Sequence, residues 1–217
     1  MNTNAYTDNY LINYITRNDY FQRSININAD NNDIAAINNF YCTASYEQLL
    51  ISMIKNIEAG QTAFTWTGPF GSGKSSLALF LQSLISDNQD LVKVAHSKLS
   101  SKNKSDIIDC FNSENQQWAT INLVGQAVAP ESLFRTALDL PDTASADDIL
   151  EALKQYTSDG KRLIIFIDEL GKVFDGAAKG NNPEDIYFLQ LLAEFVNRSQ
   201  GQMILIGILH QAFTAYA

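Results

Sequence analysis

The residues best suited to chemistry in this sequence form one run of eight, Gly68-Pro-Phe-Gly-Ser-Gly-Lys-Ser75. The run fits the pattern G-x-x-x-x-G-K-[ST], and we call it the phosphate loop. Gly71 and Gly73 allow the backbone to turn its N–H groups toward anionic oxygens. Lys74 would reach the β- and γ-phosphates of a nucleotide, and the Ser75 hydroxyl would be a ligand of Mg²⁺.

The flanks of the phosphate loop match its expected context. A short β-rich segment, 61–67, precedes it, and the apolar residues of 76–85 have helical spacing. The alternative is a glycine-rich turn that ends in Gly-Lys-Ser by chance, and a strand before the loop with a helix after it argues against that. We therefore expect the following residues to contact a nucleotide: Gly68, Pro69, Phe70, Gly71, Ser72, Gly73, Lys74, Ser75 and Ser76.

Two acids follow the most apolar run of the chain, 162–167, and give the Walker B pattern. At the carboxyl end of a strand Asp168 would hold Mg²⁺ together with Ser75. Glu169 would act as the base that orients and deprotonates the attacking water. An acid pair at a strand end is often a solvated turn, and the phosphate loop upstream favours the catalytic interpretation.

A further apolar run, 202–209, ends at His210 and Gln211. The adjacent Asp168 and Glu169 resemble the acid pair of hydrolytic P-loop ATPases, and that resemblance implies an additional strand between the phosphate-loop strand and the Walker B strand. A polar residue at its end would face the γ-phosphate. The alternative is a helix start with incidental polar residues; between the two side chains we prefer His210, the first beyond the strand. The candidate catalytic residues are Lys74, Glu169, His210 and Gln211.

Two other signals have competing interpretations. Asp168-Glu-Leu-Gly171 fits D-x-x-G and Asn103-Lys-Ser-Asp106 fits N-K-x-D, but their order is reversed from that of GTPases, so we set a GTPase aside.

Arg198 ends a predicted helix. It could be an arginine finger, although a cation at a helix C-terminus is the simpler interpretation.

The rest of the chain must hold these residues at one edge of a sheet. Apolar runs predict strands at 61–67, 91–95, 118–124, 162–168 and 202–209, and Ile25 and Ile27 suggest another short strand. Helices are predicted where apolar residues have helical spacing, at 46–57, 76–85, 131–140, 146–156 and 182–198. Thr43, Ser145 and Asn182 are the expected N-caps of the first, fourth and fifth of these helices. The alternation predicts an α/β fold with an open parallel sheet.

With these motifs, the chain resembles the additional-strand P-loop ATPases, which include the AAA+ and STAND groups. The matching segments are Gly68–Ser76, Leu163–Lys172 and Leu205–Ala217. The runs Ile-Asp-Glu-Leu-Gly-Lys and Leu-His-Gln-Ala-Phe-Thr-Ala-Tyr-Ala look like those of long multidomain ATP-binding proteins, which we associate with bacterial defence against phage. The resemblance implies ATP as the nucleotide and an AAA+-like core. The family's last strand, helical lid and second sensor arginine have no counterpart here.

The domain boundaries follow from composition. We expect an α-rich N-terminal arm over residues 1–42, packed on an ATPase core over residues 43–217 that is cut short before the last strand and lid. Residues 211–217 look like the opening turns of a helix without a stop signal, so we expect a fragment of a longer protein.

The composition of the chain limits the partners and the cellular location that we expect for it. The net charge of −9 disfavours contact with nucleic acid or an anionic membrane, and no apolar run approaches the roughly 20 residues of a membrane span. The two cysteines, Cys42 and Cys110, fit no metal or disulfide pattern, and a reducing cytoplasm is the simplest location.

These observations predict Mg²⁺-dependent ATP hydrolysis that drives conformational change in a larger, oligomeric protein. Its partners would be ATP, ADP and the missing C-terminal domains. Two alternatives stay open: an ATP-bound switch that does not hydrolyse, which would not need Glu169, and the motor part of a nucleic-acid translocase.

Overall fold

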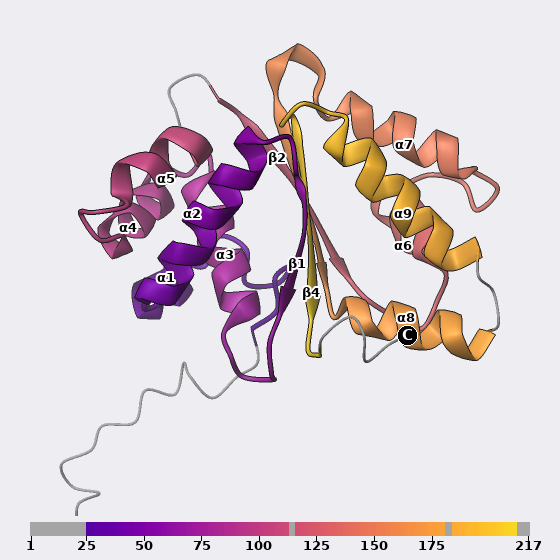
Figure 1. Ribbon diagram of the computed structural model, residues 1–217, viewed down its shortest axis with the longest axis horizontal. Coiled ribbons are helices and arrows are strands. Elements are labelled where there is room, and N and C mark those ends of the chain that lie inside the picture. Colours follow the sequence, from indigo (N-terminus) through magenta and orange to yellow (C-terminus); the bar gives the residue numbers. More distant parts are fainter. Residues whose placement is uncertain (1–24, 113–115, 181–183, 212–217) are drawn as a thin grey trace, which may run out of the picture.

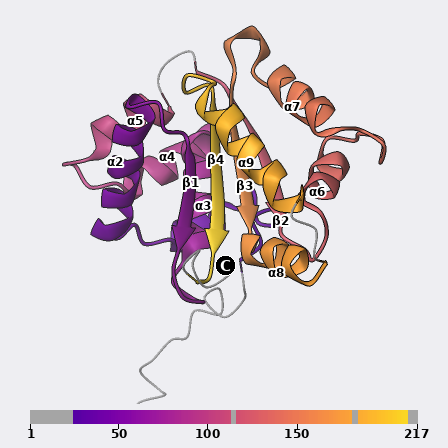
Figure 2. The same ribbon diagram turned by 45° about the vertical axis from the view of Figure 1, so that its right-hand side comes forward.

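The computed structural model describes residues 25–112, 116–180 and 184–211. In these residues four strands form one parallel sheet in the order β1-β4-β3-β2. Their bounds are β1 (Ala63–Thr67), β2 (Trp118–Val124), β3 (Arg162–Asp168) and β4 (Met203–Leu209). Figure 2 shows the strands side by side in this order. The α/β fold predicted from the sequence is confirmed.

Helices cover both faces of the sheet (Figure 1). One face carries α1 (Ile34–Asn39), α2 (Ala44–Glu58), α3 (Lys74–Leu84), α4 (Gln89–Lys98) and α5 (Lys104–Phe111). The other carries α6 (Pro130–Ala137), α7 (Ala146–Gln155), α8 (Leu170–Gly180) and α9 (Glu184–Asn197).

The two central strands bury both of their faces, as the unbroken apolar runs predict. Ile164 and Phe166 of β3 pack in the core below α1 to α5, whereas Leu163, Ile165 and Ile167 pack in the core below α6 to α9. This alternation is the two-residue period of a strand. It places Asp168, the last residue of β3, on the same side as α3 and the phosphate loop.

The additional strand is present. β4 lies between β1 and β3, with Leu205 opposite Ala63 on one side and Met203 opposite Leu163 on the other. The carboxyl ends of β1, β4 and β3 therefore meet at one edge of the sheet. The phosphate loop follows β1, His210 follows β4, and Asp168 is the last residue of β3.

The strand predicted at 91–95 is wrong, because this segment is part of α4. Leu91, Val92 and Ala95 are buried, at the spacing of one helical face. The side chain of Asn88 accepts a hydrogen bond from the N–H of Asp90 (3.0 Å) and caps the helix. The apolar residues of 91–95 fit either a strand or a helix, and burial of one helical face against the core favours the helix.

The short strand suggested by Ile25 and Ile27 is also wrong. The backbone turns here, because the Asn26 side chain accepts from the N–H groups of Asn28 and Ala29, at 2.9 and 3.1 Å. Ile27 is fully buried in the core below α3. Residues 1–24 lie outside the described residues, and the domain boundary at residue 42 stays a prediction.

Several local predictions hold. Thr43 caps α2, Ser145 and Asp148 form a capping box on α7, and Gly60 adopts φ = 82° just past α2. The proposed cap of α9 at Asn182 and Pro183 lies outside the described residues. Neither α1 nor α8 was expected from the sequence.

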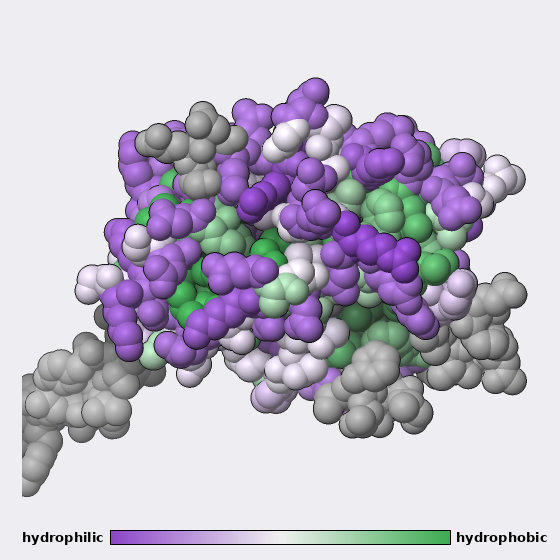
Figure 3. All heavy atoms as spheres, turned by 45° about the horizontal axis from the view of Figure 1, so that its top comes forward, coloured by the Kyte–Doolittle hydropathy of each residue, from purple (hydrophilic) through white to green (hydrophobic). Residues whose placement is uncertain are grey.

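The surface viewed in Figure 3 is dominated by hydrophilic residues, with hydrophobic ones gathered in smaller areas between them. Among the residues that the structure describes, no helix has the length and apolar character needed to cross a membrane.

Candidate functional site

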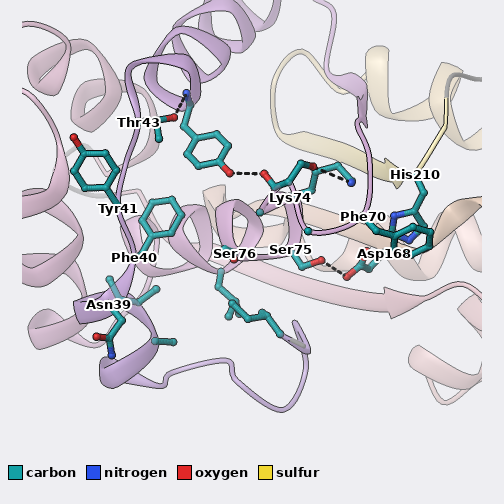
Figure 4. Close-up of a pocket in the computed structure, with 18 of the residues that line it drawn as sticks. Asn39, Phe40, Tyr41, Thr43, Phe70, Lys74, Ser75, Ser76, Asp168 and His210 are labelled. Atoms are coloured by element: carbon teal, nitrogen blue, oxygen red, sulfur yellow. Dashed lines mark hydrogen bonds between the residues drawn. The ribbon is translucent and has the colours of Figure 1, made fainter. Parts of the chain in front are cut away.

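The phosphate loop and the Walker B strand meet at Ser75 and Asp168. Ser75 is the second residue of α3, and its Oγ donates a hydrogen bond to Oδ2 of Asp168 over 2.8 Å (Figure 4). Asp168 is only 7% exposed, and its Oδ1 accepts from the N–H of Glu169 at 2.8 Å. Two residues separated by 93 positions in the chain are therefore in direct contact, as the motif predicts.

The phosphate loop has the backbone that its glycines permit. Gly71 and Gly73 have φ of 74° and 80°, a left-handed region that favours glycine. Gly68 donates its N–H to the carbonyl of Leu209, the last residue of β4, over 3.3 Å. This hydrogen bond links the start of the phosphate loop, just after β1, to the end of β4.

Lys74 lies along the inside of its own loop. Its Nζ donates to the carbonyl oxygens of Gly68 and Pro69 at 2.6 and 2.9 Å, and to Oγ of Ser72 at 3.2 Å. Burial lowers the pKa of the Lys74 ammonium, and the nearby Asp168 carboxylate opposes that shift. A cation held by neutral oxygens can exchange them for phosphate oxygens, which bind it more strongly.

Glu169 begins a sharp turn directly after β3. Its φ of 53° is unusual for a residue with a side chain, and such conformations gather at functional sites. The side chain is 30% exposed, and a carboxylate oxygen forms an ion pair with Lys172, one turn along the start of α8. Gly125, just past β2, donates its N–H to the carbonyl of Asp168 over 2.7 Å, and this hydrogen bond stabilises the backbone where the turn at Glu169 begins.

His210 follows β4 and stacks on Phe70 of the phosphate loop. The ring centroids are 3.6 Å apart and the planes 20° from parallel (Figure 4). Both ring nitrogens are shielded from solvent and have no hydrogen-bond partner among the described residues. Burial, followed by the charge of Lys74, lowers the pKa of His210, against the pull of Asp168 and Glu169.

Gln211, the other candidate at the end of β4, is exposed. It does not line the cavity that contains His210. His210 therefore lines the cavity and Gln211 does not, and contact of His210 with the γ-phosphate stays a prediction.

A cavity of about 680 Å³ joins these groups. The residues on its phosphate side are Phe70, Gly71, Ser72, Gly73, Lys74, Ser75, Ser76, Asp168, Glu169 and His210. The opposite side is formed by a segment before α2, with Asn39, Phe40, Tyr41 and Thr43 lining it. Sequence reasoning missed this second side, because no motif marks it and only tertiary packing brings it to the loop.

Two residues with competing interpretations lie elsewhere. Nδ2 of Asn103 donates to Oε2 of Glu47 over 2.8 Å, in a contact between α5 and α2 outside the cavity, which removes the guanine-reading interpretation. Arg198 pairs with Glu194 at 3.3 Å and precedes β4, whereas His210 follows it. A strand of seven residues, roughly 23 Å, therefore separates Arg198 from this site.

The donor set suits a hard divalent cation. Ser75 and Asp168 offer a hydroxyl and a carboxylate, the oxygen ligands that Mg²⁺ prefers alongside phosphate oxygens. Within the residues described, no group of three or more His, Cys, Asp or Glu side chains could hold a metal by itself. A Mg²⁺ ion here would depend on nucleotide phosphates for part of its coordination.

A protein-family model described as "ATPase family associated with various cellular activities (AAA)" matches residues 65–214. The structure of the ORC2 protein of Aeropyrum pernix, in ADPNP and ADP complexes, superposes with a TM-score of 0.51 at 17% identity, over 85% of this chain and 47% of that one. C. elegans PCH-2 gives a TM-score of 0.45 at 12% identity, over 83% of this chain and 41% of that one. No curated protein matches the sequence. The chain thus spans less than half the length of either solved structure.

Proposed function

The chain belongs to the AAA family of ATPases, and from that premise we propose that its cavity binds ATP with Mg²⁺ and hydrolyses the γ-phosphate. The observation that carries the proposal is the 2.8 Å contact between Ser75 and Asp168. It joins the end of the phosphate loop to the end of the Walker B strand, which is the arrangement that a Mg²⁺–triphosphate complex requires.

Each group of the site has a proposed role. The N–H groups of the phosphate loop and Lys74 bind the β- and γ-phosphates, and Ser75 with Asp168 would hold the metal. When bound, Mg²⁺ neutralises charge on the phosphate oxygens and so favours attack at phosphorus. His210, kept neutral by burial, would donate one ring N–H to a γ-phosphate oxygen. The base of the nucleotide would lie on the side of Asn39–Thr43.

Glu169 is the proposed general base. It would accept a proton from the attacking water, which requires its carboxylate to face the γ-phosphate. The proposal is supported by Glu169 lining the same cavity as Asp168 and His210. In this role the side chain, which is 30% exposed, would turn from Lys172 toward the cavity.

The ion pair between Glu169 and Lys172 favours a second candidate function, a nucleotide-bound switch with slow turnover. A carboxylate paired with a lysine is turned toward that partner rather than toward an attacking water. In this alternative, ATP binding sets a conformation and hydrolysis is rare.

One experiment separates the two candidates. ATP binding and Mg²⁺-dependent hydrolysis are measured for the longest gene product that carries this domain, beside its Glu169→Gln and Lys172→Ala variants. A hydrolase loses about 100-fold or more in turnover with Glu169→Gln while still binding ATP. A switch shows the same low turnover in wild type and Glu169→Gln, and Lys172→Ala raises it.

The wider setting is proposed from the resemblance alone. We place the domain in a large, oligomeric bacterial protein in which turnover drives movement of other domains, with defence against phage as its process. A cytoplasmic location fits the two free thiols, Cys42 and Cys110. Loss of phage protection in cells carrying Glu169→Gln would support this setting, and unchanged protection would remove it.

A further inference from the structure

A tyrosine outside the sequence motifs contacts the phosphate loop. Tyr46, in the first turn of α2, donates its hydroxyl hydrogen to the backbone carbonyl of Ser72 over 2.5 Å. The two residues lie 26 positions apart, so only the packing of α2 against the loop brings them together. Nothing in the phosphate-binding pattern or the Walker B pattern predicts this contact.

The contact determines the orientation of one peptide group. A trans peptide is planar, and its C=O and the following N–H point in opposite directions. No cis peptide bond occurs in the described residues. Because Tyr46 holds the carbonyl of Ser72, the N–H of Gly73 points away from Tyr46. This N–H belongs to the loop that binds phosphate through backbone N–H groups.

Gly73 also shows how closely Tyr46 fits. A Cβ atom placed on Gly73 would lie 2.2 Å from the Tyr46 oxygen, and Gly73 has φ = 80°. A peptide next to a glycine rotates easily, because both left- and right-handed backbone conformations are accessible to it. The peptide that Tyr46 holds is therefore one that could otherwise rotate.

Stacked rings keep Tyr46 in place. Its ring stacks on Phe40, with centroids 5.8 Å apart and planes 17° from parallel. Phe40 stacks in turn on Phe80 of α3, at 4.7 Å and 22°. Phe80 is fully buried. The ring of Tyr46 is thus held by stacked aromatic side chains that reach the core at Phe80.

We propose that Tyr46 is a positioning residue for phosphate binding, which holds the Ser72–Gly73 peptide so that the Gly73 N–H is available to the nucleotide. The inference rests on the proposed function, because it deepens the account of the same site. Burial raises the pKa of the Tyr46 hydroxyl, so that it stays protonated and able to donate at any physiological pH.

The test compares two ligands that share phosphate but differ in the base. Binding of Mg–pyrophosphate and of MgADP is measured by calorimetry for wild type, Tyr46→Phe and the control Tyr187→Phe. Tyr46→Phe keeps the ring stack and removes only the hydroxyl. It should weaken both ligands by the same factor, about 5-fold, the loss expected for one neutral hydrogen bond. Tyr187 is 58% exposed on α9, and its variant should bind like wild type.

Each outcome decides the matter. If Tyr46→Phe lowers the melting temperature and leaves both affinities unchanged, Tyr46 is a structural tether only, and the inference fails while the proposed function stands. If only ADP is weakened, Tyr46 acts on the base and the inference also fails. If wild type binds neither ligand, the proposed function fails with it.

A second variant covers the case in which Tyr46→Phe does not fold. Tyr46→tetrafluorotyrosine preserves the shape of the ring and ionises far more readily than tyrosine. A phenolate cannot donate a hydrogen bond, so pyrophosphate affinity should fall as pH rises through that ionisation, whereas wild type should not follow it. Parallel pH profiles for the two proteins would overturn the proposal.

Discussion

Replacing Gly125 by alanine should slow ATP turnover by displacing the turn at Glu169, although Gly125 belongs to neither nucleotide motif. Gly125 follows β2 and supports the turn at Glu169. A Cβ atom on this glycine would lie 2.2 Å from the carbonyl oxygen of Glu169 and 2.8 Å from its carbonyl carbon. These are backbone atoms, so no side-chain rotation can relieve the overlap.

The displacement follows from these distances. To open from 2.2 Å to an ordinary contact of 3.4 Å, the turn at Glu169 or the end of β2 must shift by about 1.2 Å. A displacement of about 1 Å at a catalytic group can cost on the order of 100-fold in rate, and overpacking costs about 1–3 kcal/mol of stability. We therefore expect Gly125→Ala to fold, to bind ATP, and to turn it over at least about tenfold more slowly than wild type.

The assay is steady-state ATP hydrolysis by the longest gene product, with a thermal melt of each variant. Gly60→Ala is the matched control. Gly60 has φ = 82° and open space around its Cβ position, so its replacement should cost about 1–2 kcal/mol of stability and leave turnover unchanged. Wild-type turnover by Gly125→Ala would refute the reasoning, because the turn would then absorb the Cβ without moving Glu169.

Two other results are expected. Ser75→Ala should remove most of the Mg²⁺-dependent gain in ATP affinity, about tenfold or more, and leave metal-free binding of ADP nearly intact; equal Mg²⁺ stimulation in both proteins would show that Ser75 does not bind the metal. Burial raises the pKa of Cys42 to about 12 and that of Cys110 to about 11. At pH 8 both thiols should therefore react with iodoacetamide far more slowly in the native protein than after denaturation, as followed by mass spectrometry; equal rates would contradict their burial.

Sequence reasoning predicted the parts of the site whose chemistry is local. The spacing of Gly68 to Ser75 requires a strand before it and a helix after it, and an acid at the end of an apolar strand must lie at the same edge of a parallel sheet. The contact between Ser75 and Asp168 follows from these two constraints. The central place of β4 followed from the resemblance rather than from the residues themselves.

The remaining errors and omissions have a common physical cause. The segment 91–95 is too short for its period to separate strand from helix, and its burial against the core decided for α4. α8 contains Gly171, Gly176 and Gly180, which disfavour a helix; it forms because Leu170, Val173 and Phe174 are buried. The second side of the cavity and the role of Tyr46 depend on packing between distant segments, which a single sequence does not encode in any motif.

The position of β4 has a consequence for how the domain is made. Among the strands that the structure describes, β4 comes latest in the sequence, yet it is the partner of both β1 and β3. Ala63 therefore cannot pair with Leu205 until β4 has been synthesised. Pairing between segments so far apart closes a long loop and slows folding. On the ribosome, β1 and its phosphate loop therefore remain without a neighbouring strand until residues beyond Leu209 have emerged. During that interval the backbone N–H and C=O groups of β1 that later pair with β4 have no partner strand, and an unpaired strand edge makes a nascent chain prone to aggregation.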